Sequence, residues 1–153
     1  MKTAIWKYED LSNIQAEFPD KRVVLVGGCF DILHYGHIMF LQEAQARGDI
    51  LIVALESDEF IQETKQRTPV HTQAERAIIL TSMRWVDGVI LLPHFANKKE
   101  YGKLVELVKP QVIAVTEGDP VLENKQMIAQ KVGATVEIVT PLLSQFSTTK
   151  IRS

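Results

Sequence analysis

Two histidines that stand three residues apart, His34 and His37, are the side chains of this sequence best suited to chemistry. They lie in residues 28–37, which read GCFDILHYGH and come shortly after the apolar run VVLV. One turn of helix separates the two imidazoles, so both lie on the same side of a helix start. Free backbone N–H groups and the positive end of the helix dipole favour an anion there. The stretch therefore predicts a phosphate-binding turn in which both histidines donate hydrogen bonds to phosphate oxygens.

A second group of polar side chains lies near the end of the sequence, where Ser147, Thr148 and Thr149 precede Lys150. Consecutive hydroxyls at a helix start offer side-chain and backbone donors to a polyphosphate. The segment indicates a second place at which phosphate is bound.

The composition is that of one globular domain over residues 1–153, with 46% apolar residues and a net charge of −2. This charge gives no reason to expect binding to nucleic acid or to a membrane. No apolar run reaches the roughly 18 residues of a membrane helix, and the first residues lack the apolar core of a signal peptide. The single cysteine, Cys29, excludes an internal disulfide and indicates the cytoplasm. Without an acid–base partner nearby in sequence, Cys29 is expected to be a packing residue.

Alternating strands and helices must position these residues. Apolar runs rich in Val, Ile and Leu predict strands over residues 22–26, 50–55, 88–92, 111–115 and 135–139. Amphipathic stretches predict helices over residues 36–47, 58–65, 72–83, 101–108 and 121–132. A capping box at Thr72 and Glu75 and C-cap glycines at Gly48 and Gly133 mark helix ends. An N-terminal extension, residues 1–21, is expected to pack on the outside, with a short helix over residues 8–18.

This alternation predicts an α/β fold, a Rossmann-like doubly wound parallel five-stranded sheet with helices on both faces. Ligands of such sheets bind beyond the carboxyl ends of the strands. The glycine-containing turn at residues 27–28 lies at one of those ends.

Residues 28–37 resemble the HxGH signature of the cytidylyltransferase-like nucleotidyltransferases, in the longer form GxFDxxHxGH. Ser147, Thr148 and Thr149 are similar to that family's second signature, which holds the β- and γ-phosphates. The resemblance covers nearly the whole sequence from Arg22 onward. It implies transfer of a nucleoside monophosphate from an NTP to a phosphorylated acceptor, with release of pyrophosphate.

The resemblance also implies roles for individual residues. It makes His34, His37 and Lys65 catalytic. The implied nucleotide contacts are Gly28, Cys29, Phe30, Asp31, His34, Gly36, His37, Arg67, Gly118, Asp119, Ser147, Thr148 and Thr149. The implied acceptor contacts are Lys65, Arg76, Arg84, Lys98 and Lys99. Asp31 is expected to orient the loop more than to do chemistry.

Metal ions are expected in one form only. Mg²⁺ should arrive with the NTP, and no protein ligands for a metal are predicted. His71 and His94 have no metal-ligand spacing with the other histidines.

The resemblance divides between two groups within the family. The sequence of residues 28–34 resembles that of the adenylyltransferase domain of bacterial heptose-phosphate enzymes. The absence of an arginine from residues 142–146 is a second similarity to that domain. That group implies ATP and a sugar 1-phosphate, the pair that we favour. Arg84-Trp85-Val86-Asp87, together with Lys98 and Lys99, resembles glycerol-3-phosphate cytidylyltransferase and implies CTP. Flavin mononucleotide as acceptor and a catalytically inactive nucleotide-binding module are the remaining alternatives.

The implied reaction is an in-line attack by an acceptor phosphate oxygen on the α-phosphorus of the NTP. His34 and His37 would stabilise the five-coordinate state. The acceptor phosphate is ionised at neutral pH, so no strong general base is required. Because the sequence ends at Ser153, early in the family's last helix, residues 147–152 are expected to order only when phosphate is bound. A homodimer is expected by analogy with the family.

Overall fold

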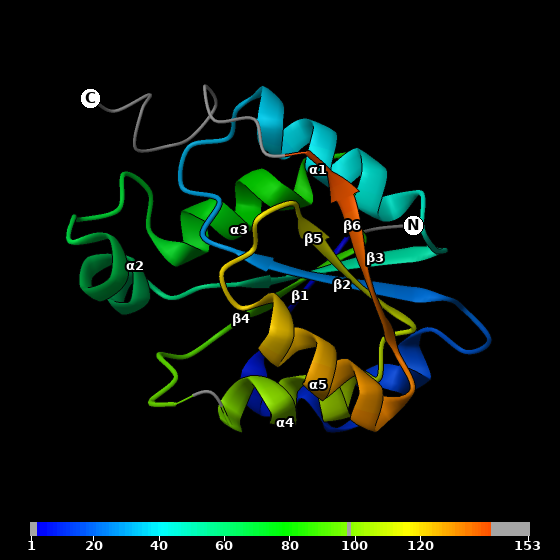
Figure 1. Cartoon of the computed structure of the whole chain (residues 1–153). Helices are drawn as coiled ribbons and strands as arrows, with labels where there is room; N and C mark the ends of the chain where they lie inside the picture. The colour runs from blue at the N-terminus through cyan, green and yellow to red at the C-terminus, as the bar shows by residue number, and fades with distance from the viewer. Residues whose placement is uncertain (1–2, 98, 142–153) are drawn as a thin grey trace.

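The computed structural model describes residues 3–97 and 99–141 and contains one sheet of six parallel strands (Figure 1). The strand order is β1-β4-β3-β2-β5-β6. The strands are β1 (Ala4–Lys7), β2 (Val23–Gly28), β3 (Ile50–Leu55), β4 (Gly88–Leu91), β5 (Val112–Thr116) and β6 (Thr135–Thr140). The five predicted strands are therefore confirmed, and the sheet has one more.

Helices cover both faces of this sheet, as the sequence predicts. They are a 3₁₀ segment η1 (Tyr8–Glu17) and the helices α1 (Tyr35–Gln45), α2 (Asp58–Lys65), α3 (Gln73–Thr81), α4 (Lys99–Val108) and α5 (Leu122–Val132). Apolar side chains of α1 and α3 pack on one face, and those of η1, α4 and α5 pack on the other (Figure 1). The fold is α/β, Rossmann-like and doubly wound.

Strand β1 corrects the prediction that residues 1–21 only pack on the outside. It pairs with β4 at the edge of the sheet, with Ala4 opposite Gly88. The ring of Trp6 lies over Gly88, where an added Cβ would come within 2.2 Å of it. The four residues of β1 alternate between half-buried and exposed. An edge strand of this kind lacks the continuous apolar run by which the buried strands were recognised.

Two of the three predicted helix boundaries are confirmed. The capping box of Thr72 and Glu75 is present at the start of α3, and Gly133 ends α5 with a positive φ of 75°. The prediction for Gly48 is wrong, because α1 ends at a C-cap formed by Ala46. Gly48 instead approaches the β2 strand closely: an added Cβ would lie 2.7 Å from the carbonyl oxygen of Arg22.

The strand order places a crevice at the centre of the sheet. From β2 the chain passes through α1 to β3 and β4 on one side, and later returns to β5 on the other. Both β3 and β5 are hydrogen-bonded to β2. The carboxyl ends of β2 and β5 therefore flank the point where the winding reverses, which is where open sheets of this type bind ligands.

Candidate functional site

The two histidines meet at the start of α1, directly after the turn that follows β2. His34 is the N-cap of α1, and its Nδ1 accepts a hydrogen bond of 3.4 Å from the backbone N–H of His37. The imidazole rings stack, with centroids 3.8 Å apart and planes inclined by 20°. Because Nδ1 of His34 is an acceptor, the neutral ring carries its proton on Nε2. That N–H is a donor of the type that binds a phosphate oxygen.

Both histidines are neutral at neutral pH. Burial lowers the pKa of His34 below its ordinary value. Burial, reinforced by the neighbouring His34, lowers the pKa of His37 to about 4, although the backbone of Ile32 opposes this shift. Without a ligand, the pair therefore offers neutral N–H donors. A bound phosphate favours the charged form of an imidazole and so raises the pKa of both rings.

An aromatic residue supports the His37 ring from the β2 turn. Phe30 is buried and adopts the left-handed backbone conformation with a φ of 47°, which is uncommon for a residue with a side chain. Its ring centroid lies 5.1 Å from that of His37. An added Cβ at Gly28 would come within 2.7 Å of the same ring. Gly28 thus leaves the space that Phe30 needs in order to pack beside His37.

Asp31 joins the β2 turn to the segment before α3. Its side chain is buried, with 1% of its surface exposed. Oδ2 accepts from the backbone N–H of Val70 (2.9 Å), and Oδ1 accepts from the backbone N–H of His71 (3.0 Å). The carboxylate therefore orients the loop around the histidines, as the sequence analysis expects of it.

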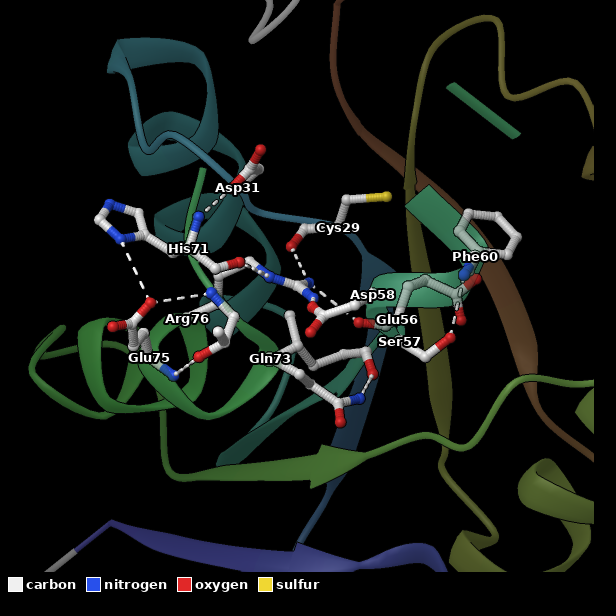
Figure 2. A network of polar contacts seen from close by, with 12 residues as sticks. Cys29, Asp31, Glu56, Ser57, Asp58, Phe60, His71, Gln73, Glu75 and Arg76 are labelled. Carbon is white, nitrogen blue, oxygen red and sulfur yellow. Dashed lines mark hydrogen bonds and ion pairs between the residues drawn. The ribbon is translucent and has the colours of Figure 1, made fainter. Parts of the chain in front are cut away.

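Arg76 on α3 connects the segments that follow β2 and β3 (Figure 2). Its fully buried guanidinium donates through Nη1 to the carbonyls of Cys29 (2.8 Å) and Glu56 (2.9 Å). Nη2 forms an ion pair of 2.6 Å with Oδ1 of Asp58, and Nε donates to the carbonyl of His71 (3.1 Å). Protein atoms thus surround this guanidinium.

Two of the implied acceptor contacts need correction. Arg76 is buried and bonded to protein, so it positions the loops of the site and does not face an acceptor. Arg84 lies between α3 and the amino end of β4, at the edge of the sheet opposite to His34 and His37. It is exposed there, 5.7 Å from the ring centroid of Trp85. Within one chain, Arg84 therefore lies away from the histidines.

We call Lys65, the last residue of α2, and Arg67, which follows it, the basic loop; this loop lies near the β2 turn. Lys65 and Arg67 are close enough that their charges lower the pKa of the Cys29 thiol, although burial dominates and raises it overall. The thiol is accordingly protonated at neutral pH, in keeping with a packing role for Cys29. Lys99, an exposed residue, begins α4 after the carboxyl end of β4. These three cations are on the histidine edge of the sheet. Of the remaining predicted residues, Lys98, Ser147, Thr148 and Thr149 lie outside the described residues.

The turn after β5 completes the edge. Gly118 has a positive φ of 82°. Asp119 accepts a hydrogen bond of 2.8 Å from the backbone N–H of Val121 and forms an ion pair of 2.7 Å with Lys125 on α5. Gly36 is the second residue of α1, adjacent to His37.

Sequence reasoning missed several polar residues at this edge. Gln73 donates to the carbonyls of Leu55 (3.0 Å) and Leu92 (2.8 Å), so it joins the ends of β3 and β4. Glu56, Tyr101 and Lys125 were also not singled out. For Glu56 a signal existed, because a carboxylate directly follows six buried apolar residues at a strand end.

Within residues 3–97 and 99–141, no helix combines the length and apolar character needed to cross a membrane. In the same part of the chain, no three His, Cys, Asp or Glu side chains come together in a way that could hold a metal ion.

Comparison with known proteins gives one family match and a set of similar sequences. The model of the cytidylyltransferase-like family matches residues 25–153. Bifunctional protein HldE from Aliarcobacter butzleri is 35% identical over 135 residues, which cover 86% of this chain and 27% of that protein. Its counterpart from Koribacter versatilis is 36% identical over 135 residues, covering 86% of this chain and 26% of that protein. The chain thus spans about a quarter of the length of these curated relatives.

Two solved structures share the fold. The lipopolysaccharide core biosynthesis protein from Thermoplasma volcanium is 29% identical with a TM-score of 0.64, and the match covers 83% of this chain and 99% of that one. Pantoate-beta-alanine ligase from Francisella tularensis, complexed with beta-gamma ATP and beta-alanine, is 19% identical with a TM-score of 0.67. That match covers 99% of this chain and 76% of the ligase, and it speaks for the fold alone.

Proposed function

The chain belongs to the cytidylyltransferase-like family, and from this membership and the histidine edge we propose that it is a nucleotidyltransferase. It transfers a nucleoside monophosphate from an NTP to a phosphorylated acceptor and releases pyrophosphate. The observation that carries this proposal is the stacked pair of His34 and His37 at the start of α1. Two neutral donors, a helix N-terminus and a nearby basic loop together favour a polyphosphate.

The reaction breaks one bond and forms one bond. An acceptor phosphate oxygen attacks the α-phosphorus of the NTP, and the bond from that phosphorus to the bridging oxygen of the β-phosphate breaks. His34 and His37 donate to phosphate oxygens as charge develops on them. The main chain at Gly28, Cys29, Phe30, Gly36 and Gly118 lines the nucleotide, while Lys65 and Arg67 neutralise phosphate charge. Positioning and electrostatics supply the catalysis, since no covalent intermediate is required.

Mg²⁺ enters this proposal with the NTP. Phosphate oxygens of the nucleotide would hold the ion, and its charge would offset that of the phosphates. Ser147, Thr148 and Thr149 remain assigned to the β- and γ-phosphates by the sequence signature alone.

We propose ATP and a sugar 1-phosphate as the substrate pair. The sequence around residues 28–34 resembles the heptose-phosphate adenylyltransferases, and the relative from T. volcanium is described as a lipopolysaccharide core biosynthesis protein. The position of Arg84, at the far edge of the sheet, removes one argument for glycerol 3-phosphate and CTP. The cytoplasm, where these substrates are found, is the proposed location. A homodimer remains part of the proposal by family analogy, and no nucleic-acid or membrane partner is proposed.

A pyrophosphate-release assay tests the function. ATP and CTP are crossed with heptose 1-phosphate, glycerol 3-phosphate and flavin mononucleotide in the presence of Mg²⁺. Release with ATP and the sugar 1-phosphate supports the proposed pair, and release with CTP and glycerol 3-phosphate supports the alternative. Nucleotide binding without release on any acceptor favours an inactive nucleotide-binding module.

A further inference from the structure

Glu56 lies at the histidine edge of the sheet, in a position that its backbone fixes. It directly follows β3, whose six residues are all buried. Its N–H donates to the carbonyl of Gly28 (3.0 Å), and its own carbonyl accepts from Arg76 (2.9 Å). The residue is therefore held beside the turn that leads from β2 to the two histidines.

Polar side chains from other segments lie within electrostatic range of Glu56 or of its neighbour Tyr101. The pKa of Glu56 responds to the charges of Lys125 on α5 and His94 after β4, and the pKa of Tyr101 on α4 responds to Glu56 and Asp119. We call Glu56, His94, Tyr101, Asp119 and Lys125 the Glu56 cluster. It lies between the end of β3 and the helices α4 and α5, across the sheet edge from the helix that carries His37.

Each basic side chain near Glu56 contacts a different carboxylate. Lys125 is 2.7 Å from Asp119, and His94 is 3.0 Å from Glu63. Arg76 pairs with Asp58 through Nη2. Among residues 3–97 and 99–141, no side chain forms a hydrogen bond or an ion pair with the carboxylate of Glu56. A half-buried carboxylate without a protein partner is available to a ligand that donates hydrogen bonds to it.

The neighbours of Cys29 indicate which part of the acceptor lies near Glu56. The charges of Glu56, Lys65 and Arg67 all act on the thiol of Cys29, so the three residues lie within electrostatic range of the same point at the end of β2. An acceptor whose phosphate lies at the basic loop therefore extends its body toward the Glu56 cluster. The donors that this body needs are uncharged, because Lys125 and Arg76 already supply positive charge there.

Resting on the proposed transfer reaction, we propose that Glu56 is a specificity-determining residue that accepts hydrogen bonds from hydroxyls of the acceptor. The acceptor class that this residue selects is a polyhydroxylated phosphate, a sugar or polyol phosphate. Burial raises the pKa of Glu56 to about 7, against the opposing charges of Lys125, His94 and Arg76. Hydroxyl donors stabilise the ionised carboxylate and so lower that pKa when the acceptor binds.

The test measures acceptor binding rather than turnover. Wild-type protein, Glu56→Gln and Glu56→Ala are each saturated with the α,β-methylene analogue of ATP and titrated calorimetrically with heptose 1-phosphate and with its singly deoxygenated analogues. Glu59→Gln is the matched control, because Glu59 is an exposed carboxylate three residues further along the same segment. Loss of a hydrogen bond to a charged group weakens binding about 10-fold or more.

The expected result has three parts. Both Glu56 variants bind the sugar phosphate about 10- to 100-fold more weakly than wild-type protein does, while their affinity for the ATP analogue is unchanged. Glu59→Gln behaves as the wild type does. One deoxygenated analogue binds wild-type and Glu56→Gln protein equally, because it lacks the hydroxyl that Glu56 contacts.

Other outcomes separate this inference from the proposed function. Equal affinities of wild-type and Glu56→Gln protein for every sugar phosphate overturn the role of Glu56, even where pyrophosphate is released. Failure of wild-type protein to bind any sugar or polyol phosphate also overturns it. Binding that depends on Glu56, without pyrophosphate release from any acceptor, supports the inference about ligand class and contradicts the proposed transfer.

Discussion

His34 fixes His37 through two contacts of different kinds. The Nδ1 atom of His34 accepts the backbone N–H of His37, and the ring of His34 stacks on the ring of His37 with centroids 3.8 Å apart. The first contact caps α1, and the second holds the two imidazoles nearly parallel, while burial lowers the pKa of both rings. The side chain of His34 therefore both caps α1 and contributes a donor to the site, whereas the side chain of His37 does not cap the helix. The two residues can be separated by mutation.

Replacing His37 with alanine is expected to lower kcat for pyrophosphate release by about 10²- to 10³-fold, the usual effect of removing one preorganised donor. The backbone N–H that contacts His34 is retained, so the thermal unfolding midpoint should change little. His71→Ala is the matched control, because the structure uses the backbone of His71 in its bonds to Asp31 and Arg76. Unchanged kcat in folded His37→Ala protein would falsify the catalytic assignment.

His34 should respond differently to asparagine and to alanine. Asparagine is a good N-cap, so His34→Asn keeps the cap of α1 while removing the Nε2–H donor. We expect the Tm of His34→Asn to match that of the wild type, with kcat lowered as in His37→Ala. His34→Ala should lose about 0.5–2 kcal/mol of stability in addition. Chemical denaturation with parallel kinetics measures both effects, and full activity of the asparagine variant contradicts a donor role for His34.

Arg76 is expected to act on stability. Arg76→Met leaves the carbonyls of Cys29, Glu56 and His71 without this donor, and a buried hydrogen-bonding group left without a partner costs about 1–3 kcal/mol. Urea unfolding of Arg76→Met should show a loss of that size. A direct acceptor contact predicts the reverse pattern: a raised KM for the acceptor with little loss of stability. Arg84→Met, at the far edge of the sheet, is the control and should leave KM unchanged.

Glu56 is expected to make stability depend on pH. Its pKa lies near 7 in the folded protein, above the ordinary value of 4.5. Between these values the folded state binds the extra proton, so this group destabilises the fold as pH rises from about 4.5 to 7. Glu56→Gln removes that term. The difference in Tm between variant and wild type should be near zero at pH 4.5 and should favour the variant above pH 7.

The pKa shift from 4.5 to about 7 corresponds to about 3 kcal/mol. Each kcal/mol moves the Tm of a domain of this size by roughly 2–4 °C, so the difference should be about 6–12 °C. His37 titrates in an overlapping range with the opposite sign, but it is present in both proteins and cancels. A Tm difference that is constant from pH 4.5 to pH 8 contradicts the raised pKa. A larger Tm together with weaker acceptor binding would indicate that the carboxylate is kept for the ligand at the expense of the fold.

Five of the six strands were predicted from the sequence, and the N-terminal edge strand β1 was not. The strands around β2 are continuous apolar runs because helices cover both faces of the sheet. β1 was not predicted because alternate residues of this strand are exposed, so it is not a continuous apolar run. The prediction for Gly48 was wrong because its close approach to Arg22 is a tertiary contact. Local spacing predicts a helix end equally well whether or not another strand passes nearby.

The site divides in a similar way. His34, His37 and Asp31 follow one another in sequence, so a motif contains their arrangement. Arg84 was misplaced because a motif carries no information about which edge of the sheet its residues reach. Glu56 alone had a signal in the sequence, but the Glu56 cluster was missed because its members come from five separate segments and meet only in the folded chain. Residues that lie far apart in the sequence form no local motif from which a site could be predicted.

The bonds of Arg76 have a consequence for how such a site can diverge. One guanidinium links the segments after β2 and β3 with the segment before α3, so a change in the length of one of these loops displaces the others. Insertions and deletions, the usual means by which α/β proteins acquire new ligands, are thereby restricted on this side of the crevice. A new acceptor is more readily accommodated by exchanging single side chains on an unchanged backbone. Engineering of acceptor choice in this protein should accordingly begin with substitutions at Glu56 and its neighbours and leave the loop lengths intact.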